Sequence, residues 1–154
     1  MCGIWGCIGR HATTTEQAVC HTALHNRGPE ANLVCDISDC GNATLGFTRL
    51  ALNGLGSLGM QPMRQGGLTW ICNGEIYNWK ELAERHGLLC QSDSDCSVLG
   101  PLWYKFRDQP EQFFRSLDGV FALILVDSHT NTAIIGRDPY GVRPLFQVTE
   151  IGRA

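Results

Sequence analysis

Hydrophobic positions along the chain fall into short blocks that are separated by polar and glycine-containing stretches. Apolar runs of this length are typical of buried strands. The four segments predicted as strands on this basis are Cys2–Ile8, Leu33–Cys35, Thr44–Leu50 and Leu68–Cys72. The last is followed by Asn73-Gly74, a dipeptide typical of tight turns, so this strand is expected to end there.

The longest apolar run, Val120–Val126, ends at an aspartate and is followed by the polar segment Ser128–Asn131. A second apolar segment, Ala133–Ile135, comes directly afterwards. Two apolar segments joined by a short polar turn predict a β-hairpin.

Three helices are predicted, each from a capping residue at its start. They are Thr13–His25, Asn78–His86 and Asp95–Phe106. Gly87 suits the end of the second helix, and Gly100-Pro101 should bend or interrupt the third. Asn53–Gly59 contains three glycines without periodicity and is expected to be a loop. Helices and hairpins without regular strand–helix alternation predict a layered domain that contains antiparallel sheet.

The length of 154 residues fits one domain. Hydrophobic residues make up 44% and charged residues 18%, as in ordinary globular proteins. The net charge is -3 and no block of Lys or Arg occurs, which argues against a nucleic-acid or membrane-surface partner. No apolar run approaches the roughly 18 to 20 residues of a membrane helix. The N-terminus has no basic leader, so a cytoplasmic location is expected.

The eight cysteines require separate consideration, because a high cysteine count can indicate metal binding or disulfides. They stand at positions 2, 7, 20, 35, 40, 72, 90 and 96, without a C-x-x-C pair. This spacing is unlike that of zinc sites, and disulfides are not expected without a secretory signal. Free thiols and no metal are therefore predicted, with a cysteine-rich metal or redox protein as an alternative.

Cys2 is the one thiol for which the sequence indicates chemistry. Removal of Met1 would leave a thiol and a free α-amine on the same residue, with ordinary pKa values of about 8.5 and about 7.7–8.0. The amine can then act as the base that activates the thiol, and Gly3 would allow close approach of a substrate. A cysteine at position 2 is by itself more often incidental.

Four further residues suggest a site, although each also has a purely structural explanation. Arg49 stands in an apolar strand and needs an anion, either a salt-bridge partner or an amino-acid carboxylate. Asn73 and Gly74 supply a side-chain amide and a backbone N–H suited to an oxyanion hole, or they form a plain turn. Asp95 either caps a helix or receives an ammonium group.

Eight segments of the chain occur in the order seen in glutamine-hydrolysing asparagine synthetases, which the sequence resembles over nearly its whole length. The segments are Met1–Trp5, Arg27–Glu30, Arg49–Ala51, Gly59–Pro62, Asn73–Asn78, Ser94–Cys96, Leu117–Ala122 and Gly136–Phe146. The strings Asn-Gly-Glu-Ile-Tyr-Asn and Gly-Met-Gln-Pro favour this family over other class II amidotransferases. The resemblance implies that residues 1–154 form a glutamine amidotransferase domain, incomplete at its C-terminus. The implied fold is an α+β N-terminal nucleophile hydrolase, a four-layer αββα sandwich of two antiparallel sheets.

The resemblance also implies roles for single residues. Cys2 is similar to the family's nucleophile, and Asn73 and Gly74 resemble its oxyanion hole. The residues that resemble glutamine ligands are Arg49 for the α-carboxylate, Glu75 and Asp95 for the α-amine, and the backbone around Leu52 and Asn53. The implied reaction is hydrolysis of glutamine to glutamate and ammonia through a Cys2 thioester.

In the family this ammonia serves the ATP-dependent conversion of aspartate to asparagine. No cofactor is expected for glutamine hydrolysis itself, whereas ATP and Mg would be needed by a synthetase half. Its Ser-Gly-Gly-x-Asp-Ser loop does not occur in these residues. A synthetase domain or subunit is therefore the expected partner besides glutamine, and a homodimer is left open.

Several departures from the family pattern keep other functions open. Asn26, Glu30 and Thr48 stand where the family often has His, Asp and His, and the loop after Leu52 is one residue longer. These changes would weaken glutamine binding without removing a reacting group. The alternatives are a non-catalytic glutamine-binding or regulatory fragment, and the glutaminase domain of another class II amidotransferase.

Overall fold

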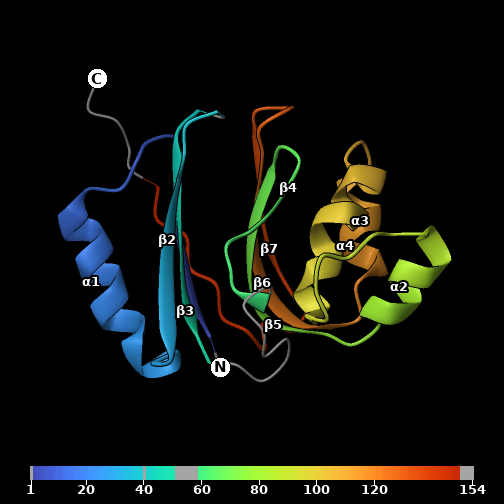
Figure 1. Ribbon diagram of the computed structural model, residues 1–154, viewed down its shortest axis with the longest axis horizontal. Helices are drawn as coiled ribbons and strands as arrows, with labels where there is room; N and C mark the ends of the chain where they lie inside the picture. Colours follow the sequence, from blue (N-terminus) through green and yellow to red (C-terminus); the bar gives the residue numbers. More distant parts are fainter. Residues whose placement is uncertain (1, 40, 51–58, 150–154) are drawn as a thin grey trace.

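Two antiparallel sheets face each other and carry helices on both outer sides (Figure 1). The structure, a computed structural model, describes residues 2–39, 41–50 and 59–149. Helix α1 (Thr14–Leu24) covers one sheet, and the α-helices that follow β5 (Leu68–Ile76) in the chain and precede β6 (Gly119–Asp127) cover the other (Figure 1). The order of layers is thus helix, sheet, sheet, helix, which confirms the predicted α+β sandwich.

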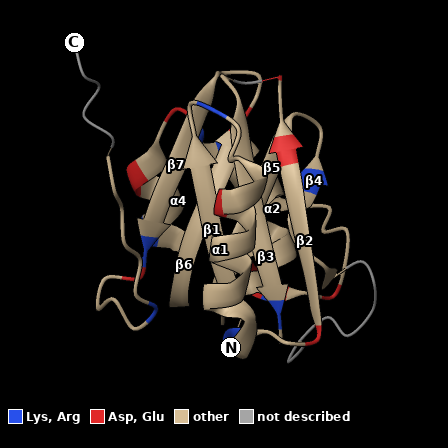
Figure 2. Ribbon diagram, turned by 90° about the vertical axis from the view of Figure 1, so that its left-hand side faces the viewer, with Lys and Arg blue, Asp and Glu red and all other residues tan. Residues whose placement is uncertain are grey.

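The first sheet has the strand order β1-β3-β2. Its strands are β1 (Gly3–Ile8), β2 (Ala31–Ile37) and β3 (Ala43–Arg49). Helix α1 lies in front of this sheet, and acidic and basic residues are scattered over the described part of that face (Figure 2). Thr13 caps α1, because its hydroxyl oxygen accepts a hydrogen bond from the Glu16 N–H. The Glu16 carboxylate in turn accepts a hydrogen bond from the Thr13 N–H. This capping box confirms the predicted start of the helix, and a short turn, η1 (His25–Arg27), follows.

The second sheet has the strand order β4-β5-β6-β7. Its strands are β4 (Met63–Gln65), β5 (Leu68–Ile76), β6 (Gly119–Asp127) and β7 (Thr132–Arg137). The β6–β7 pair confirms the predicted hairpin. The predicted turn at Asn73-Gly74 is wrong, because β5 continues through both residues to pair with Ala122 and Phe121. Pairing with β6 along the whole strand outweighs the local turn tendency of Asn-Gly.

The helices outside the second sheet are α2 (Trp79–His86), η3 (Asp95–Val98), α3 (Leu99–Phe106) and α4 (Pro110–Ser116). Gly87 ends α2 with a φ of 61°, as predicted. Asn78 occupies the N-cap position, but its side chain does not cap the helix. It donates to the Ser116 carbonyl (2.8 Å) and accepts from the Asp118 N–H (3.0 Å). Asn78 therefore joins the end of β5 to the segment that enters β6.

The predicted helix from Asp95 to Phe106 consists of two segments, and the second of them, α3, continues through the Gly100-Pro101 pair. The boundary between η3 and α3 lies at Leu99, just before that pair. Pro101 falls in the first turn of α3, where a missing N–H costs no helical hydrogen bond. The prediction that Asp95 caps the helix is wrong, because Ser94 holds the N-cap position.

The core has two parts, one between the sheets and one between the second sheet and its helices. The first contains Leu45, Phe47, Ile71 and Ile124, and the second contains Trp70, Leu102, Trp103 and Phe113. Strands β5 and β6 contribute to both parts, so both of their faces are buried. This explains why their sequences read as unbroken apolar runs. Each large apolar side chain buried here contributes about 1.5–3 kcal/mol to folding.

Among the described residues, the seven cysteines are free thiols. No helix in this part of the chain has both the length and the apolar character needed to cross a membrane. The described residues also contain no group of three or more His, Cys, Asp or Glu side chains arranged to hold a metal ion.

Candidate active site

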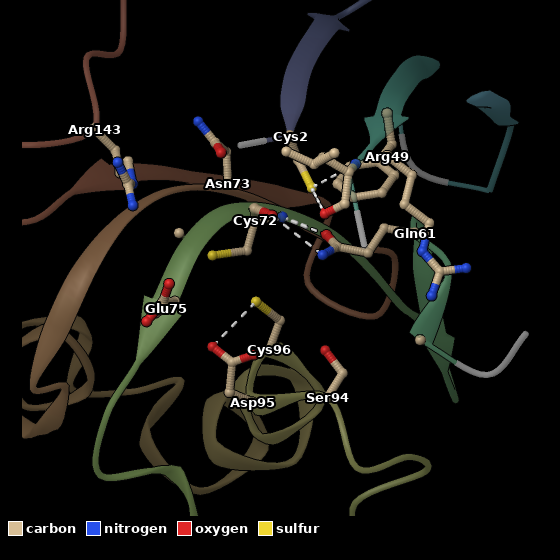
Figure 3. Close-up of a pocket in the computed structure, with 14 residues that line it drawn as sticks. Cys2, Arg49, Gln61, Cys72, Asn73, Glu75, Ser94, Asp95, Cys96 and Arg143 are labelled. Atoms are coloured by element: carbon tan, nitrogen blue, oxygen red, sulfur yellow. Dashed lines mark hydrogen bonds between the residues drawn. The ribbon is translucent and has the colours of Figure 1, made fainter. Parts of the chain in front are cut away.

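A pocket lined by residues of both sheets and of η3 gathers six of the eight residues singled out from the sequence (Figure 3). They are Cys2, Arg49, Asn73, Gly74, Glu75 and Asp95. Strands β3 and β5 supply four of them, Cys2 directly precedes β1, and Asp95 begins η3. Leu52 and Asn53, together with most of the predicted loop at 53–59, lie outside the described residues.

Cys2 is fixed between the ends of β1 and β3. Its Sγ lies 3.4 Å from both the carbonyl oxygen and the backbone nitrogen of Leu50. Arg27 Nε donates to the Cys2 carbonyl at 3.1 Å. Burial raises the pKa of the Cys2 thiol, and the Leu50 hydrogen bond only partly opposes this rise. The thiol is thus held neutral near pH 7 and needs a base before it can act as a nucleophile.

Gly3 has a packing role in addition to any effect on substrate approach. A Cβ at this position would lie 2.6 Å from Thr48 Oγ1 and 2.9 Å from the Cβ of Leu24. The absence of a side chain at Gly3 leaves room for the side chains of Thr48 and Leu24 next to Cys2.

Successive backbone N–H and C=O groups of β5 point to opposite edges of the strand. In an antiparallel pair, the N–H and C=O of one residue point to one neighbouring strand and those of the next residue point away. Just beyond β5, Tyr77 donates its N–H to the Asp118 carbonyl before β6 (2.7 Å). By this alternation, the N–H groups of residues 73 and 75 also point toward β6. The N–H groups of residues 72, 74 and 76 therefore point to the opposite edge of β5, away from β6.

Side chains bind the outer two of these three N–H groups. The Cys72 N–H donates to Gln61 Oε1 (2.5 Å), and the Ile76 N–H donates to Asp95 Oδ2 (2.7 Å). Gly74 lies between them on the same edge and lines the pocket. The strand geometry therefore directs the Gly74 N–H toward the space that a substrate would occupy.

Only glycine fits at position 74. Its φ is 155°, a value that other residues rarely adopt. A Cβ there would lie 2.0 Å from the Val120 carbonyl oxygen and 2.6 Å from the Phe121 Cα. The neighbouring Asn73 is 6% exposed, and its amide lies on the same side of β5 as the Cys2 sulfur (Figure 3). A buried amide and a backbone N–H beside a thiol can stabilise an oxyanion formed when that thiol attacks a carbonyl.

Glu75 and Asp95 form an acidic region at the other side of the pocket (Figure 3). Asp95 is 6% exposed, and Cys96 Sγ lies 3.9 Å from its Oδ2. Burial raises the pKa of the Asp95 carboxyl, and the nearby charge of Glu75 raises it further. Two carboxylates in a confined space favour a positively charged ligand group, because such a group relieves their mutual repulsion.

The pocket also contains residues to which sequence analysis gave no role, including Gln61, Cys72, Ser94, Cys96 and Arg143. Gln61, Ser94, Cys96 and Arg143 lie in three of the eight family segments, and for Gln61 and Arg143 this was the only signal in the sequence. The position of Arg143 depends on a buried turn. Asp138 accepts the N–H groups of Tyr140 (3.1 Å), Val142 (3.0 Å) and Arg143 (3.1 Å), which brings this segment against the pocket.

A family model described as a glutamine amidotransferase domain matches residues 1–153. The chain belongs to the glutamine amidotransferase family. It is 40% identical over 152 residues to the glutamine-hydrolysing asparagine synthetase of Gallus gallus, covering 96% of this chain and 26% of that protein. The same enzyme of Mesocricetus auratus is 39% identical over 156 residues, covering 99% of this chain and 27% of the relative. The corresponding figures for Bos taurus are 38% over 156 residues, 99% and 27%.

These matches confirm the resemblance found in the sequence motifs. The chain spans about a quarter of the length of the curated relatives, 26% and 27% in the cases above.

Proposed function

We propose that this chain hydrolyses glutamine to glutamate and ammonia, with Cys2 as the nucleophile. One observation carries the proposal. The Cys2 thiol, the Asn73 amide and the Gly74 edge of β5 meet at one pocket, and carboxylates line its other side. Membership of the glutamine amidotransferase family supports glutamine as the substrate.

The proposed reaction begins with removal of Met1, which gives Cys2 a free α-amine. Because burial raises the pKa of the thiol, the amine is needed to accept its proton. The sulfur then attacks the side-chain amide carbon of glutamine, and Asn73 and Gly74 stabilise the oxyanion. The C–N bond breaks, the amine returns its proton to the departing ammonia, and water hydrolyses the thioester to glutamate.

The remaining pocket residues are assigned to recognition of the amino-acid part of glutamine. Arg49 would bind the α-carboxylate, for which its planar guanidinium is suited. Glu75 and Asp95 would bind the α-ammonium group, and the raised pKa of Asp95 is consistent with a carboxylate that awaits a cation. Leu52 and Asn53 are assigned to the same pocket through the family resemblance alone.

The proposed use of the ammonia is asparagine synthesis. The relatives are named as glutamine-hydrolysing asparagine synthetases, and this chain matches about a quarter of their length. We therefore propose that a synthetase domain or subunit receives the ammonia and uses ATP and Mg to convert aspartate. No cofactor is proposed for glutamine hydrolysis at Cys2, because the α-amine, the oxyanion donors and water supply the groups that its steps require.

A glutamine-binding module without catalysis is the second candidate. It is favoured by the neutral resting state of Cys2, whose thiol has a raised pKa and is occupied by hydrogen bonds with Leu50. Such a module would bind glutamine through the same carboxylates and release no glutamate.

Intact-mass measurement with a diazo-ketone analogue of glutamine separates the two candidates. Catalysis predicts loss of Met1 and one adduct located on Cys2, together with glutamate release from glutamine. The Cys2→Ala variant should form no adduct. A wild-type protein that has lost Met1 and binds glutamine, but gives neither adduct nor glutamate, would refute the catalytic proposal and support the binding module.

A further inference from the structure

Gln61 is a buried side chain that binds the backbone of Cys72 at both ends of its amide. Its Nε2 donates to the Cys72 carbonyl at 3.1 Å, and its Oε1 accepts the Cys72 N–H at 2.5 Å. Gln61 is 4% exposed and lines the pocket beside Asn73. Both of its polar groups are thus used to hold main chain, in the pattern by which one strand binds its neighbour.

This side chain replaces a strand that is missing at this point of the sheet. Strand β4 pairs with β5 only from Leu68 to Trp70, so their ladder ends two residues before Cys72. In the described part of the chain, the Gln61 amide provides the next pair of hydrogen bonds along the same edge. Without it, the buried N–H and C=O of Cys72 would lose these partners, and such a loss is unfavourable.

Fixing the backbone of Cys72 affects the next two residues, Asn73 and Gly74, which form the proposed oxyanion hole. The Cys72 carbonyl belongs to the peptide unit that leads into Asn73, and Gly74 follows directly. Gly74 has no Cβ to restrict its backbone and adopts a φ of 155°. Its direction must therefore be imposed by its surroundings. Gln61 holds the strand on one side of Gly74, and Asp95 holds the Ile76 N–H on the other.

We propose that Gln61 is a positioning residue for the oxyanion hole. Its amide continues the sheet past the end of β4 and fixes the main chain of Cys72. The Asn73 side chain and the Gly74 N–H are thereby directed at the reacting carbonyl. Gln61 acts through the backbone and does not touch the substrate. This inference rests on the proposed hydrolysis of glutamine at Cys2.

Replacement of Gln61 by methionine tests the idea, because methionine has similar length and lacks both hydrogen-bonding groups. The expected result is a fall in kcat for glutamate release of about ten- to a hundredfold. This is smaller than the loss from removing an oxyanion donor outright, which is about a hundred- to a thousandfold. The KM for glutamine should change by less than about threefold, since the groups that bind the amino-acid part remain.

Gln65→Met is the matched control, because Gln65 lies on the nearby strand β4 and does not line the pocket. It should keep the wild-type kcat. Gln61→Glu is a second variant, which retains an acceptor for the Cys72 N–H but places an oxygen against the Cys72 carbonyl. It should also lower kcat, and it serves if the methionine variant does not fold.

Three results would overturn the inference. They are an unchanged kcat in a folded Gln61 variant, a raised KM with unchanged kcat, and an equal loss of kcat in the Gln65 control. If the wild-type protein releases no glutamate, the proposed function itself fails. Amide hydrogen exchange of the peptide Cys72–Ile76 then tests Gln61 separately: faster exchange in Gln61→Met than in Gln65→Met supports its role in holding the strand, and equal exchange refutes it.

Discussion

Asp95 accepts a hydrogen bond from the backbone N–H of Ile76 through its Oδ2 at 2.7 Å, and this bond ties η3 to the end of β5. The carboxylate is 6% exposed and lies in the same pocket as Cys2. The bond fixes the orientation of the carboxylate relative to Gly74, which is two residues before Ile76. Asp95 therefore has a structural role in the strand and a proposed role in binding the substrate, and substitutions can separate the two.

Asp95→Asn should raise the KM for glutamine about tenfold to a hundredfold, with a much smaller change in kcat. The amide keeps an acceptor for the Ile76 N–H but lacks the charge that pairs with the α-ammonium group, and such charged hydrogen bonds contribute about 1.5–3 kcal/mol. Steady-state kinetics of glutamate release measure this effect. Asp95→Ala should also lower the melting temperature, because it removes the acceptor. An unchanged KM in both variants would remove Asp95 from the glutamine site.

The raised pKa of Asp95 predicts a pH dependence of glutamine binding. The protonated carboxyl cannot pair with an ammonium group, so the KM should rise as the pH falls through a value above the ordinary 3.8. The contribution of Asp95 to folding stability should depend on pH in the opposite direction. Because burial favours the protonated form in the folded state, the contribution of Asp95 to stability is greatest at low pH and falls as the pH rises. In Asp95→Asn, the contribution of residue 95 to the pH dependence of KM should disappear, and so should its contribution to the pH dependence of stability.

The site residues on β5 could be found from the sequence, but the structure that presents them could not. Asn73-Gly74 is locally a turn signal, and only the partner strand β6 shows that β5 continues through it. Asp95 and Asn78 are good capping residues, yet both side chains bind main chain that is distant in the sequence. Local preference identifies where a polar side chain is useful, whereas its partner is decided by tertiary neighbours.

The elements missed in the sequence were short or polar. Strand β4 has three residues, Met63–Gln65, of which two are polar, and helix α4 has only seven. Neither is long enough to show a period. Gln61 was missed for a different reason, since its role arises where β4 ends and no pattern within its own segment indicates that point.

Gly74→Ala should abolish most activity. A Cβ at this position would meet the Val120 carbonyl at 2.0 Å, so the strand must shift and carry the oxyanion donor with it. A fall in kcat of about a hundredfold or more is expected, together with a lower melting temperature. Gly87→Ala is a suitable control. That residue also has positive φ, but no atom lies within 4 Å of its Cβ position. It should cost about 1 kcal/mol of stability and leave kcat unchanged. Wild-type kcat in Gly74→Ala would contradict the assigned oxyanion hole.

The N-terminus of α1 should give the fold a stability component that is sensitive to acid. Hydrogen bonds from Arg10, and then from Thr13, lower the pKa of Glu16 from 4.5 to about 2. A lowered folded-state pKa stabilises the protein above pH 4.5, and this contribution is lost as the pH falls toward 2. Urea unfolding of the wild type and of Glu16→Gln should differ at pH 6 and converge near pH 2. A difference that stays constant over this range would contradict the assignment.

Cys2→Ala should abolish glutamate release while glutamine still binds. The methyl group removes the sulfur that forms the thioester, but it leaves Arg49, Glu75 and Asp95 at the pocket. Calorimetry or a glutamine-dependent rise in melting temperature would measure the binding that remains.

Cys2→Ser is a second variant at the same position. Its hydroxyl has a far higher pKa than a thiol, so the α-amine cannot readily deprotonate it, and release should be strongly reduced. Equal glutamate release by the wild type and Cys2→Ala would place the reaction elsewhere. Loss of both release and binding would show instead that Cys2 helps to hold the pocket, through the hydrogen bonds that its sulfur exchanges with Leu50.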